Sequence, residues 1–380
     1  MNRVVVAGLG DSGLLSAIKL AKAKDVEVTG ISTKPGLVSG QELGWRLSRP
    51  DHWAQHNWIT FDRYRGLDRV RTVHGELTGA DLTGRTVSVR GADGTETIEQ
   101  FDALVISTGV RNGFWRQPIM QTADEVDAEL AKAHDRLATA TSVIVVGGGA
   151  AAVSSAANIA LTWPDTRVDL YFPGERALAG HHPRTWAKVR QRLADAGVVL
   201  HPSHRAVLPD AFTGEEITTG AVEWSTGQSS ASADAVLWTV GLVRPNTGWL
   251  PADVLDDDGF VRVTPELRVP GHDRVFAIGD VAATDPLRSS ARNRADGLLA
   301  HNVVNVLAGD TGLPLKSYRP PRSRWGSVVG IQRDGLEVFA PNGRAFRFPA
   351  WSFERVLMPW IVRRGIYRGI RSAPRVSSVH

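Results

Sequence analysis

Two units of strand, glycine-rich turn, helix and strand constrain the fold of this chain more than any other feature. The first unit occupies residues 3–32 and the second occupies residues 142–172. In each unit an apolar run, RVVVAG in the first and SVIVVGG in the second, leads directly into the glycines. Such a run is typical of a buried parallel strand. The two units therefore predict an α/β chain with two Rossmann-type dinucleotide-binding domains.

The turn of the first unit has the glycine spacing that a bound dinucleotide requires. Gly8 permits the tight turn, Gly10 lets the backbone approach a pyrophosphate, and Gly13 lets the helix pack closely on the strand. The amides at the start of the helix, around Ser12, then face the phosphates. The alternative is a glycine turn that only connects a strand to a helix, and the second copy disfavours it.

The second unit carries the same motif with one substitution. Gly147 and Gly149 are followed by Ala152, and alanine is allowed at the third position of the fingerprint. We expect a nicotinamide cofactor here, with Gly241 at the end of a later strand of the same domain. The alternative is a degenerate Rossmann unit that is kept only for packing.

The order of the remaining segments predicts three structural parts. Residues 70–109 alternate in period two and read as antiparallel strands followed by a return strand. We expect a discontinuous first nucleotide-binding domain of residues 1–112 and 242–318, with the second domain, residues 113–241, inserted into it. Residues 319–380 form a small C-terminal α+β piece with a basic, aromatic tail.

The chain of 380 residues contains no cysteine, which excludes several kinds of chemistry. A redox disulfide, a thiolate-bound cluster and a cysteine nucleophile all require that residue. We also expect no metal site, because the adjacent His181 and His182 do not share a helix face and no third ligand follows at a telling spacing. The N-terminus lacks the pattern of a secretory signal, and no window has the length of a membrane span. These features favour a cytoplasmic location.

The positive charge of the chain is concentrated in the tail. The formal net charge is +4, and residues 355–380 contain six arginines and no acidic residue. The rest of the chain therefore has a net charge of −2. A nucleic-acid-binding protein usually spreads its basic residues over a folded face, so we expect no nucleic-acid partner.

The ends of two further strands carry polar residues that could contact a cofactor. Thr108 and Gly109 end the segment DALVISTG, and Asp280 ends the segment VFAIGD. An aspartate at the carboxyl end of a buried strand can accept hydrogen bonds from a ribityl hydroxyl. It can equally cap the helix that follows, because aspartate is favoured at helix N-caps.

Taken together, these motifs resemble a known family. The segments VIVVGGGAAAVSSAANI, GLPLKSYRP and VFAIGD are similar to those of the pyridine nucleotide-disulfide oxidoreductase superfamily, here without the disulfide. The likeness covers residues 1 to about 320 and is to flavoproteins related to apoptosis-inducing factor and type II NADH dehydrogenases. It is particularly evident for the ferroptosis-suppressor-like NAD(P)H:quinone oxidoreductases.

The resemblance implies which cofactor each domain binds. FAD would lie in the discontinuous domain, with its pyrophosphate at Gly8, Gly10 and Gly13, its ribityl side at Asp280 and a further contact at Arg294. NAD(P)H would lie in the inserted domain, with the two reactive rings meeting at the interface between the domains.

Three positions depart from the pattern of the family. Ser32, with Lys34 close by, stands where relatives have an acidic residue that holds the adenosine ribose. Ser154 stands where relatives often have a glutamate close to the nicotinamide. The second unit also lacks the acidic residue that repels a 2′-phosphate and carries Arg176 nearby, which makes NADPH as well as NADH a candidate reductant.

Residues that follow the first unit could face a substrate. Gln41, Glu42 and Arg46 lie where relatives place residues near the flavin ring, and the alternative is an ordinary helix surface. Among the tryptophans, Trp53, Trp58 and Trp115 are candidates to border a substrate pocket. No catalytic residue is identified, because the flavin carries the chemistry and the protein positions it.

The sequence therefore predicts an FAD-dependent oxidoreductase that takes a hydride from NADPH or NADH and reduces a quinone or another small acceptor. A reductase for a protein such as ferredoxin, a tailoring enzyme of specialised metabolism and a flavin-binding regulator with a decayed NAD(P)H site remain alternatives. The tail, broken into two short helices at Pro359, would bind the inner face of a membrane. Alternatively it packs on its own fold or on the partner in a homodimer.

Overall fold

The largest sheet among the described residues has seven strands. The structure is a computed structural model that describes residues 1–210, 212–214, 217–284, 295–309, 314–320 and 326–372. The strands follow the order β16-β8-β1-β2-β5-β6-β7. Their bounds are β1 Asn2–Ala7, β2 Val26–Ser32, β5 Val70–Asp81, β6 Thr86–Gly91, β7 Glu96–Gln100, β8 Ala103–Ile106 and β16 Val275–Ala277.

The central strands of this sheet are parallel and buried on both faces. β1 pairs in parallel with β2 and β8, and β16 joins the far side of β8. Helices α1 (Asp11–Leu20) and α7 (Asp296–Leu307) cover one face, where Leu14 and Leu299 pack against β1 and β8. The strand β16 comes from beyond residue 242, so the return of the chain to this sheet is part of its core.

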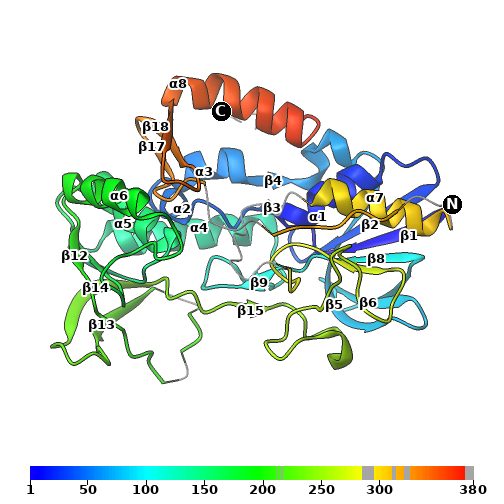
Figure 1. Cartoon of the computed structure of the whole chain (residues 1–380), viewed down its shortest axis with the longest axis horizontal. Helices are drawn as coiled ribbons and strands as arrows, with labels where there is room; N and C mark the ends of the chain where they lie inside the picture. The colour runs from blue at the N-terminus through cyan, green and yellow to red at the C-terminus, as the bar shows by residue number, and fades with distance from the viewer. Residues whose placement is uncertain (211, 215–216, 285–294, 310–313, 321–325, 373–380) are drawn as a thin grey trace, which may run out of the picture.

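The second sheet has five strands in the order β12-β11-β10-β14-β13. The bounds of these strands are β10 Ser142–Val146, β11 Arg167–Tyr171, β12 Val199–His201, β13 Thr218–Val222 and β14 Ala231–Trp238. Helices α4 (Ala123–Ala138), α5 (Ala150–Thr162) and α6 (Pro183–Asp195) belong to this lobe. Both sheets have the mainly parallel α/β arrangement expected of Rossmann-type units, and Figure 1 shows them as two lobes.

Two short strands cross between the lobes. β9 (Val110–Arg111) and β15 (Arg244–Pro245) form an antiparallel pair where the chain leaves the first lobe and returns to it. The predicted boundaries near 112 and 242 are next to this pair, and the division into domains stays a prediction. The other short elements are β3 Gly36–Val38, β4 Trp58–Thr60, α2 Leu43–Ser48, α3 Pro50–Asn57, η1 Phe61–Arg63, η2 Arg65–Leu67 and η3 Ala252–Val254.

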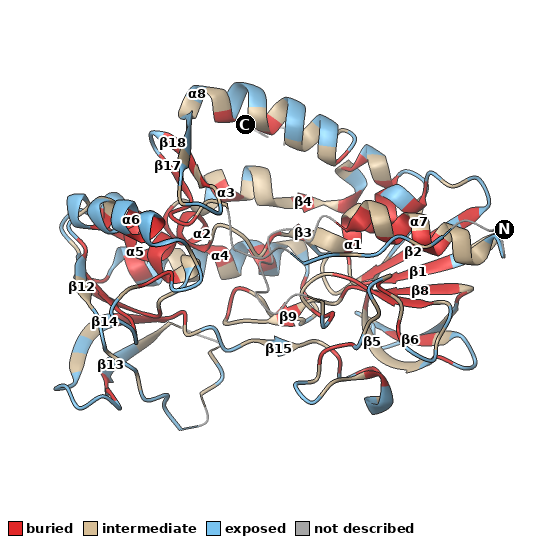
Figure 2. Cartoon of the chain, in the orientation of Figure 1, coloured by how far each residue is buried: buried red, intermediate tan, exposed pale blue. Residues whose placement is uncertain are grey.

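The C-terminal segment forms a small sheet and a helix that lies across the molecule. The strands β17 (Ile331–Gln332), β18 (Gly335–Phe339) and β19 (Ala345–Pro349) are antiparallel, and α8 (Ala350–Ser352) continues into the π-helix η5 (Phe353–Ile366). Figures 1 and 2 show this helix extending from the small sheet, over α3, toward the α1 and α7 side of the first lobe. Within the described ranges, no helix has the length and apolar character needed to cross a membrane.

The expected break at Pro359 is wrong. Pro359 lies inside η5, which continues without interruption. Proline normally breaks an α-helix because it lacks an amide donor and crowds the carbonyl four residues earlier. A π-helix instead bonds each amide to the carbonyl five residues earlier. Buried side chains on both sides of the proline, Phe353, Met358 and Tyr367, hold the segment in one piece.

Candidate functional site

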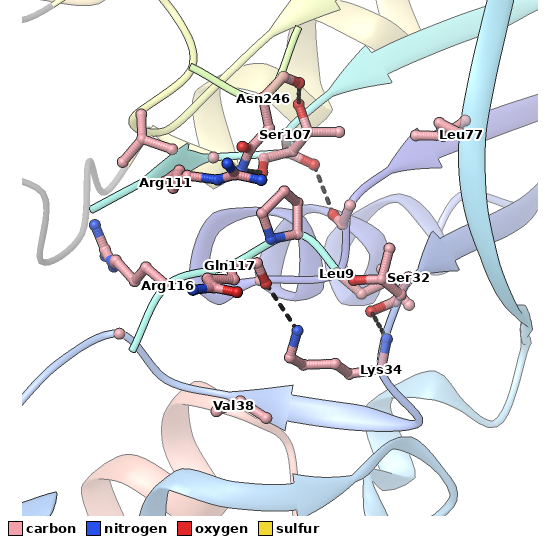
Figure 3. A pocket seen from close by; sticks show the side chains of 18 of the residues that line it. Leu9, Ser32, Lys34, Val38, Leu77, Ser107, Arg111, Arg116, Gln117 and Asn246 are labelled. Atoms are coloured by element: carbon pink, nitrogen blue, oxygen red, sulfur yellow. Dashed lines mark hydrogen bonds between the residues drawn. The ribbon is translucent and has the colours of Figure 1, made fainter. Parts of the chain in front are cut away.

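A cavity of about 680 Å³ lies at the carboxyl ends of the parallel strands of the first lobe. These ends meet at one edge of the sheet, where ligands of open α/β folds bind. The cavity brings together most of the residues predicted for the first nucleotide (Figure 3). They are Gly8, Gly10, Ser12, Ser32, Lys34, Thr108, Gly109 and Asp280, of which Figure 3 labels Ser32 and Lys34.

The first glycine turn has the shape that a pyrophosphate needs. Gly8 has a φ of +97°, and a Cβ there would lie 2.6 Å from the carbonyl oxygen of Ser107. A Cβ at Gly13 would overlap the carbonyl of Gly8, so glycine is needed for α1 to approach β1. Gly10, in contrast, has open space around its Cβ position and is the N-cap of α1. The turn therefore packs tightly on the protein and leaves its open side at the helix N-terminus.

Asp280 lies in the cavity lining and is held by Arg116. The distance between Arg116 Nη1 and Asp280 Oδ2 is 2.9 Å, and both side chains are largely buried. The residue at the N-cap of α7 is Ala295, so the capping role for that helix does not belong to Asp280. The carboxylate is thus oriented toward the cavity by a neighbouring arginine.

Ser32 ends β2 and Lys34 follows it, at the place where relatives have an acidic residue. The Lys34 amide donates to Ser32 Oγ at 3.2 Å, and Lys34 Nζ donates to the carbonyls of Gln117 (2.9 Å) and Ile119 (3.2 Å). Burial lowers the pKa of Lys34 to about 8, and Glu129 opposes this shift only in part. The lysine is therefore a cation of the cavity wall whose charge changes just above neutral pH.

The affinity of the cavity for an anionic dinucleotide is expected to fall as the pH rises through about 8. A negative ligand favours the protonated lysine, which dominates below that pH. Between pH 7 and 9.5 the Kd for FAD should rise by about three- to tenfold. In Lys34→Met the Kd should be raised at pH 7 and change little with pH, as followed by flavin fluorescence. Lys24 is exposed, so in Lys24→Met the Kd for FAD should depend on pH as it does in the unmodified protein. The same pH dependence in Lys34→Met would contradict a role for the Lys34 charge.

Arg46 joins α2 to α4 at the wall of the cavity. Arg46 Nη2 lies 2.8 Å from Glu129 Oε1, Arg46 Nη1 donates to the carbonyl of Trp115 at 3.0 Å, and the guanidinium lies 5.3 Å from the centre of the Trp53 ring. Burial lowers the pKa of Arg46, and the contact with Glu129 opposes the shift. Arg46 thus has a structural role in addition to its place in the lining.

Gln41 and Glu42 lie beside α2 and are not among the residues that line the described cavity. The carbonyl of Gln41 accepts from the indole of Trp53 at 3.1 Å. Glu42 Oε2 accepts the amide of Ile331 at 3.1 Å, so it connects α2 to the C-terminal sheet. A substrate role for these two residues stays a prediction.

The second glycine turn repeats the geometry of the first. Gly147 has a φ of +143°, and a Cβ there would lie 2.6 Å from Thr239 Oγ1. Gly149 is the N-cap of α5 and has open space around its Cβ position, while Ala152 is fully buried. Gly241, with a φ of +74°, follows the end of β14. The second lobe therefore also presents an open helix N-terminus.

The other residues predicted for the second site have defined positions. Ser154 is buried, and its Oγ has no hydrogen-bond partner among the described residues. The guanidinium of Arg176 donates to the carbonyls of Ala179 (3.2 Å) and His181 (3.3 Å), which fixes it in the loop after β11. Arg294 lies outside the described residues.

Several lining residues were not found from the sequence. Arg116 and Gln117 lie in an irregular segment with no motif, so no sequence signal marked them as cavity residues. Trp115 lines the cavity, whereas Trp53 and Trp58 do not, and a substrate role for these tryptophans stays a prediction. Trp249 also lines it, and no sequence motif marks that residue.

Two Rossmann-like sheets, each with an open glycine turn at a helix N-terminus, are typical of the class of proteins that bind two dinucleotides. The profile of the pyridine nucleotide-disulphide oxidoreductase family matches residues 2–302. The chain therefore belongs to that family, an oxidoreductase family whose members bind FAD and NAD(P)H.

Named relatives support the same assignment. The chain is 25% identical over 340 residues to oxidoreductase ptaL of Pestalotiopsis fici, covering 83% of this chain and 87% of that protein. It is 26% identical to ferroptosis suppressor protein 1 of Xenopus tropicalis, covering 84% and 83%. It is also 26% identical to the type II NADH:quinone oxidoreductase NdhA of Mycobacterium tuberculosis, covering 74% and 66%. The fold matches the water-forming NADH oxidase of Lactobacillus brevis with a TM-score of 0.60 at 18% identity, covering 84% and 71%. The resemblance inferred from the motifs is thus confirmed at the level of the family.

Proposed function

We propose that this protein binds FAD in the cavity of the first lobe and NAD(P)H at the glycine turn of the second, and reduces a small acceptor such as a quinone. The observation that carries the proposal is the matched pair of open turns at Gly10 and Gly149, each at a helix N-terminus. When bound, FAD accepts a hydride from the nicotinamide cofactor and donates electrons to the second substrate.

The residues of the cavity fit FAD. Gly10 leaves room for a pyrophosphate beside the first amides of α1. The charged lining residues carry a positive excess that suits a diphosphate, with Lys34, Arg46, Arg90, Arg111, Arg116 and Arg244 against Asp11, Glu76, Glu129 and Asp280. Asp280 would accept a hydrogen bond from a ribityl hydroxyl. Ser32 would take the place of the carboxylate that holds the adenosine ribose in relatives.

The same residues define what the protein contributes to the reaction. Arg116 holds the Asp280 carboxylate in position, and Arg46 with Glu129 fixes α2 against α4 at the cavity wall. Because the chain contains no cysteine, electrons cannot leave through a redox disulfide. This feature favours direct transfer to an acceptor that reaches the flavin itself.

The loop after β11 favours NADPH. It has no carboxylate at the end of the strand, and Arg176 is fixed in this loop by two backbone carbonyls. An acidic residue at this point selects NADH through the ribose 2′-hydroxyl, whereas an arginine accommodates a 2′-phosphate. Ser154, in place of the glutamate of relatives, affects the positioning of the nicotinamide.

A quinone is the acceptor that we favour. The chain is similar to a protein named as an NADH:quinone oxidoreductase. A reductase for a protein partner is the second candidate within enzymes, and a flavin-binding regulator is the candidate from another class.

Anaerobic mixing tests the proposal. The FAD-loaded protein should lose its flavin absorbance within seconds of mixing with NADPH, more slowly with NADH, and regain it on addition of a short-chain quinone. A protein that binds FAD but keeps its absorbance with both cofactors would reject the enzyme and favour the regulator. Bleaching that only an oxidised ferredoxin-type protein reverses, as it is itself reduced, would favour the protein reductase.

A further inference from the structure

The C-terminal helix exposes apolar side chains on its outer side. In the described part of the chain, Trp351, Trp360, Ile361 and Val356 are 62%, 59%, 51% and 46% exposed. The neighbouring strand β19 adds two exposed phenylalanines, Phe346 (56%) and Phe348 (39%). We call the four exposed residues of the helix the outer apolar face. Figure 2 shows the exposed stretches of the helix on the side away from the lobes.

The opposite side of the same helix is fixed to the protein. Phe353, Met358 and Tyr367 are buried, and Phe353 and Met358 pack with Trp45 and Trp53. Beyond the helix, Arg371 Nη2 lies 2.8 Å from Asp68 Oδ2. The exposed residues therefore stand on a rigid element and not on a loose tail. A helix that is apolar on both sides is normally covered on both sides, so the outer apolar face requires a second covering surface.

The exposed charges along the C-terminal helix and the residues that follow it are almost all positive. Arg355, Arg364 and Arg368 are exposed on the tail, with Glu354 as the one acidic residue between positions 345 and 372. The guanidinium of Arg364 lies 5.3 Å from the centre of the Trp360 ring. Arginine combined with tryptophan at the edge of an apolar surface suits a layer that is anionic outside and apolar within.

We propose that the outer apolar face docks on an anionic phospholipid surface. The aromatic and aliphatic side chains would enter the boundary between headgroups and acyl chains, while the arginines contact lipid phosphates. A second copy of the chain is a poorer occupant. A two-fold interface joins the same patch on both subunits. The arginines of one subunit would then lie against the arginines of the other, and these like charges repel each other. The proposal concerns where the protein binds and does not rest on its redox reaction.

Removal of the tail would be a poor test, because the buried Met358 and Tyr367 would be lost with it. Substitutions on the outer side alone keep the core. We choose Trp360→Ser with Ile361→Ser to remove apolar contact, and Arg355→Glu with Arg364→Glu to reverse charge. Ile98→Ser on β7, where Ile98 is 70% exposed, and Arg190→Glu on α6 are the matched controls.

The full chain should float with phosphatidylserine-containing vesicles at low salt. With vesicles of phosphatidylcholine alone it should stay at the bottom of the gradient. The apolar double variant should reduce the partition coefficient by about tenfold or more. The charge double variant should reduce it by about thirtyfold or more at low salt, and high salt should remove most of the difference. The two controls should float like the unmodified chain. Circular dichroism and flavin reduction by NADPH should be the same for all five proteins.

Three results would overturn the proposal. One is no flotation of the unmodified chain with either lipid. Another is equal flotation of the outer-face variants and the controls. The third is a concentration-dependent dimer that the apolar double variant dissociates, which would assign the face to a second copy. Failure of flavin reduction in every variant, with flotation unchanged, would instead count against the proposed function alone.

Discussion

Valine at position 10 is expected to abolish flavin binding while leaving the fold intact. Gly10 has φ and ψ of −71° and −169°, which valine adopts readily, and nothing lies near its Cβ position. The isopropyl group would fill the space that a pyrophosphate requires. We expect the Kd for FAD to rise by at least about a hundredfold, equivalent to the loss of two or more charge-assisted hydrogen bonds. Equilibrium dialysis with FAD measures this change directly.

The second glycine turn provides the matched control. Gly149 is also an N-cap with an extended backbone and open space around it, so Gly149→Val has a comparable folding cost of about 0.5–1 kcal/mol. This variant should retain FAD and lose reduction by NAD(P)H. Each variant should thus lose one cofactor and keep the other. Loss of FAD in both, or in neither, would refute the assignment of the two turns.

Replacing Arg176 with alanine is expected to change the choice of reductant. A guanidinium that contacts a 2′-phosphate contributes about 2–3 kcal/mol. The KM for NADPH should therefore rise by about thirty- to 150-fold, and the KM for NADH by less than about twofold. Steady-state reduction of a quinone with each cofactor measures the two values.

The contacts of Arg176 decide how this experiment is interpreted. Because its guanidinium also holds the carbonyls of Ala179 and His181, its loss could loosen the loop. A loosened loop would impair both cofactors equally, whereas loss of a phosphate contact impairs only NADPH. Arg176→Lys, which keeps the charge and loses the fork geometry, should show an intermediate loss for NADPH. An equal effect of alanine on both cofactors would reject the proposed contact.

The sequence by itself determined the two Rossmann-type units and their glycine turns. The spacing at Gly8 to Gly13 and at Gly147 to Ala152 is local, and each glycine answers a steric demand of the adjoining strand and helix. The return of the chain to the first sheet was also visible in the apolar segment before Asp280. Short-range patterns were sufficient here because a βαβ unit is built from neighbouring residues.

Only the tertiary structure decided which distant side chains meet. Arg116 reaches Asp280 across 164 positions, and Arg46 reaches Glu129 across 83, with no motif to link either pair. The tail shows the same limit, since its apolar residues look alike in the sequence. Packing against α2 and α3 buries Phe353 and Met358 and leaves Trp351 and Trp360 outside. It also keeps the helix continuous through Pro359, where local propensity predicted a break, because burial on both sides of the proline outweighs its local cost.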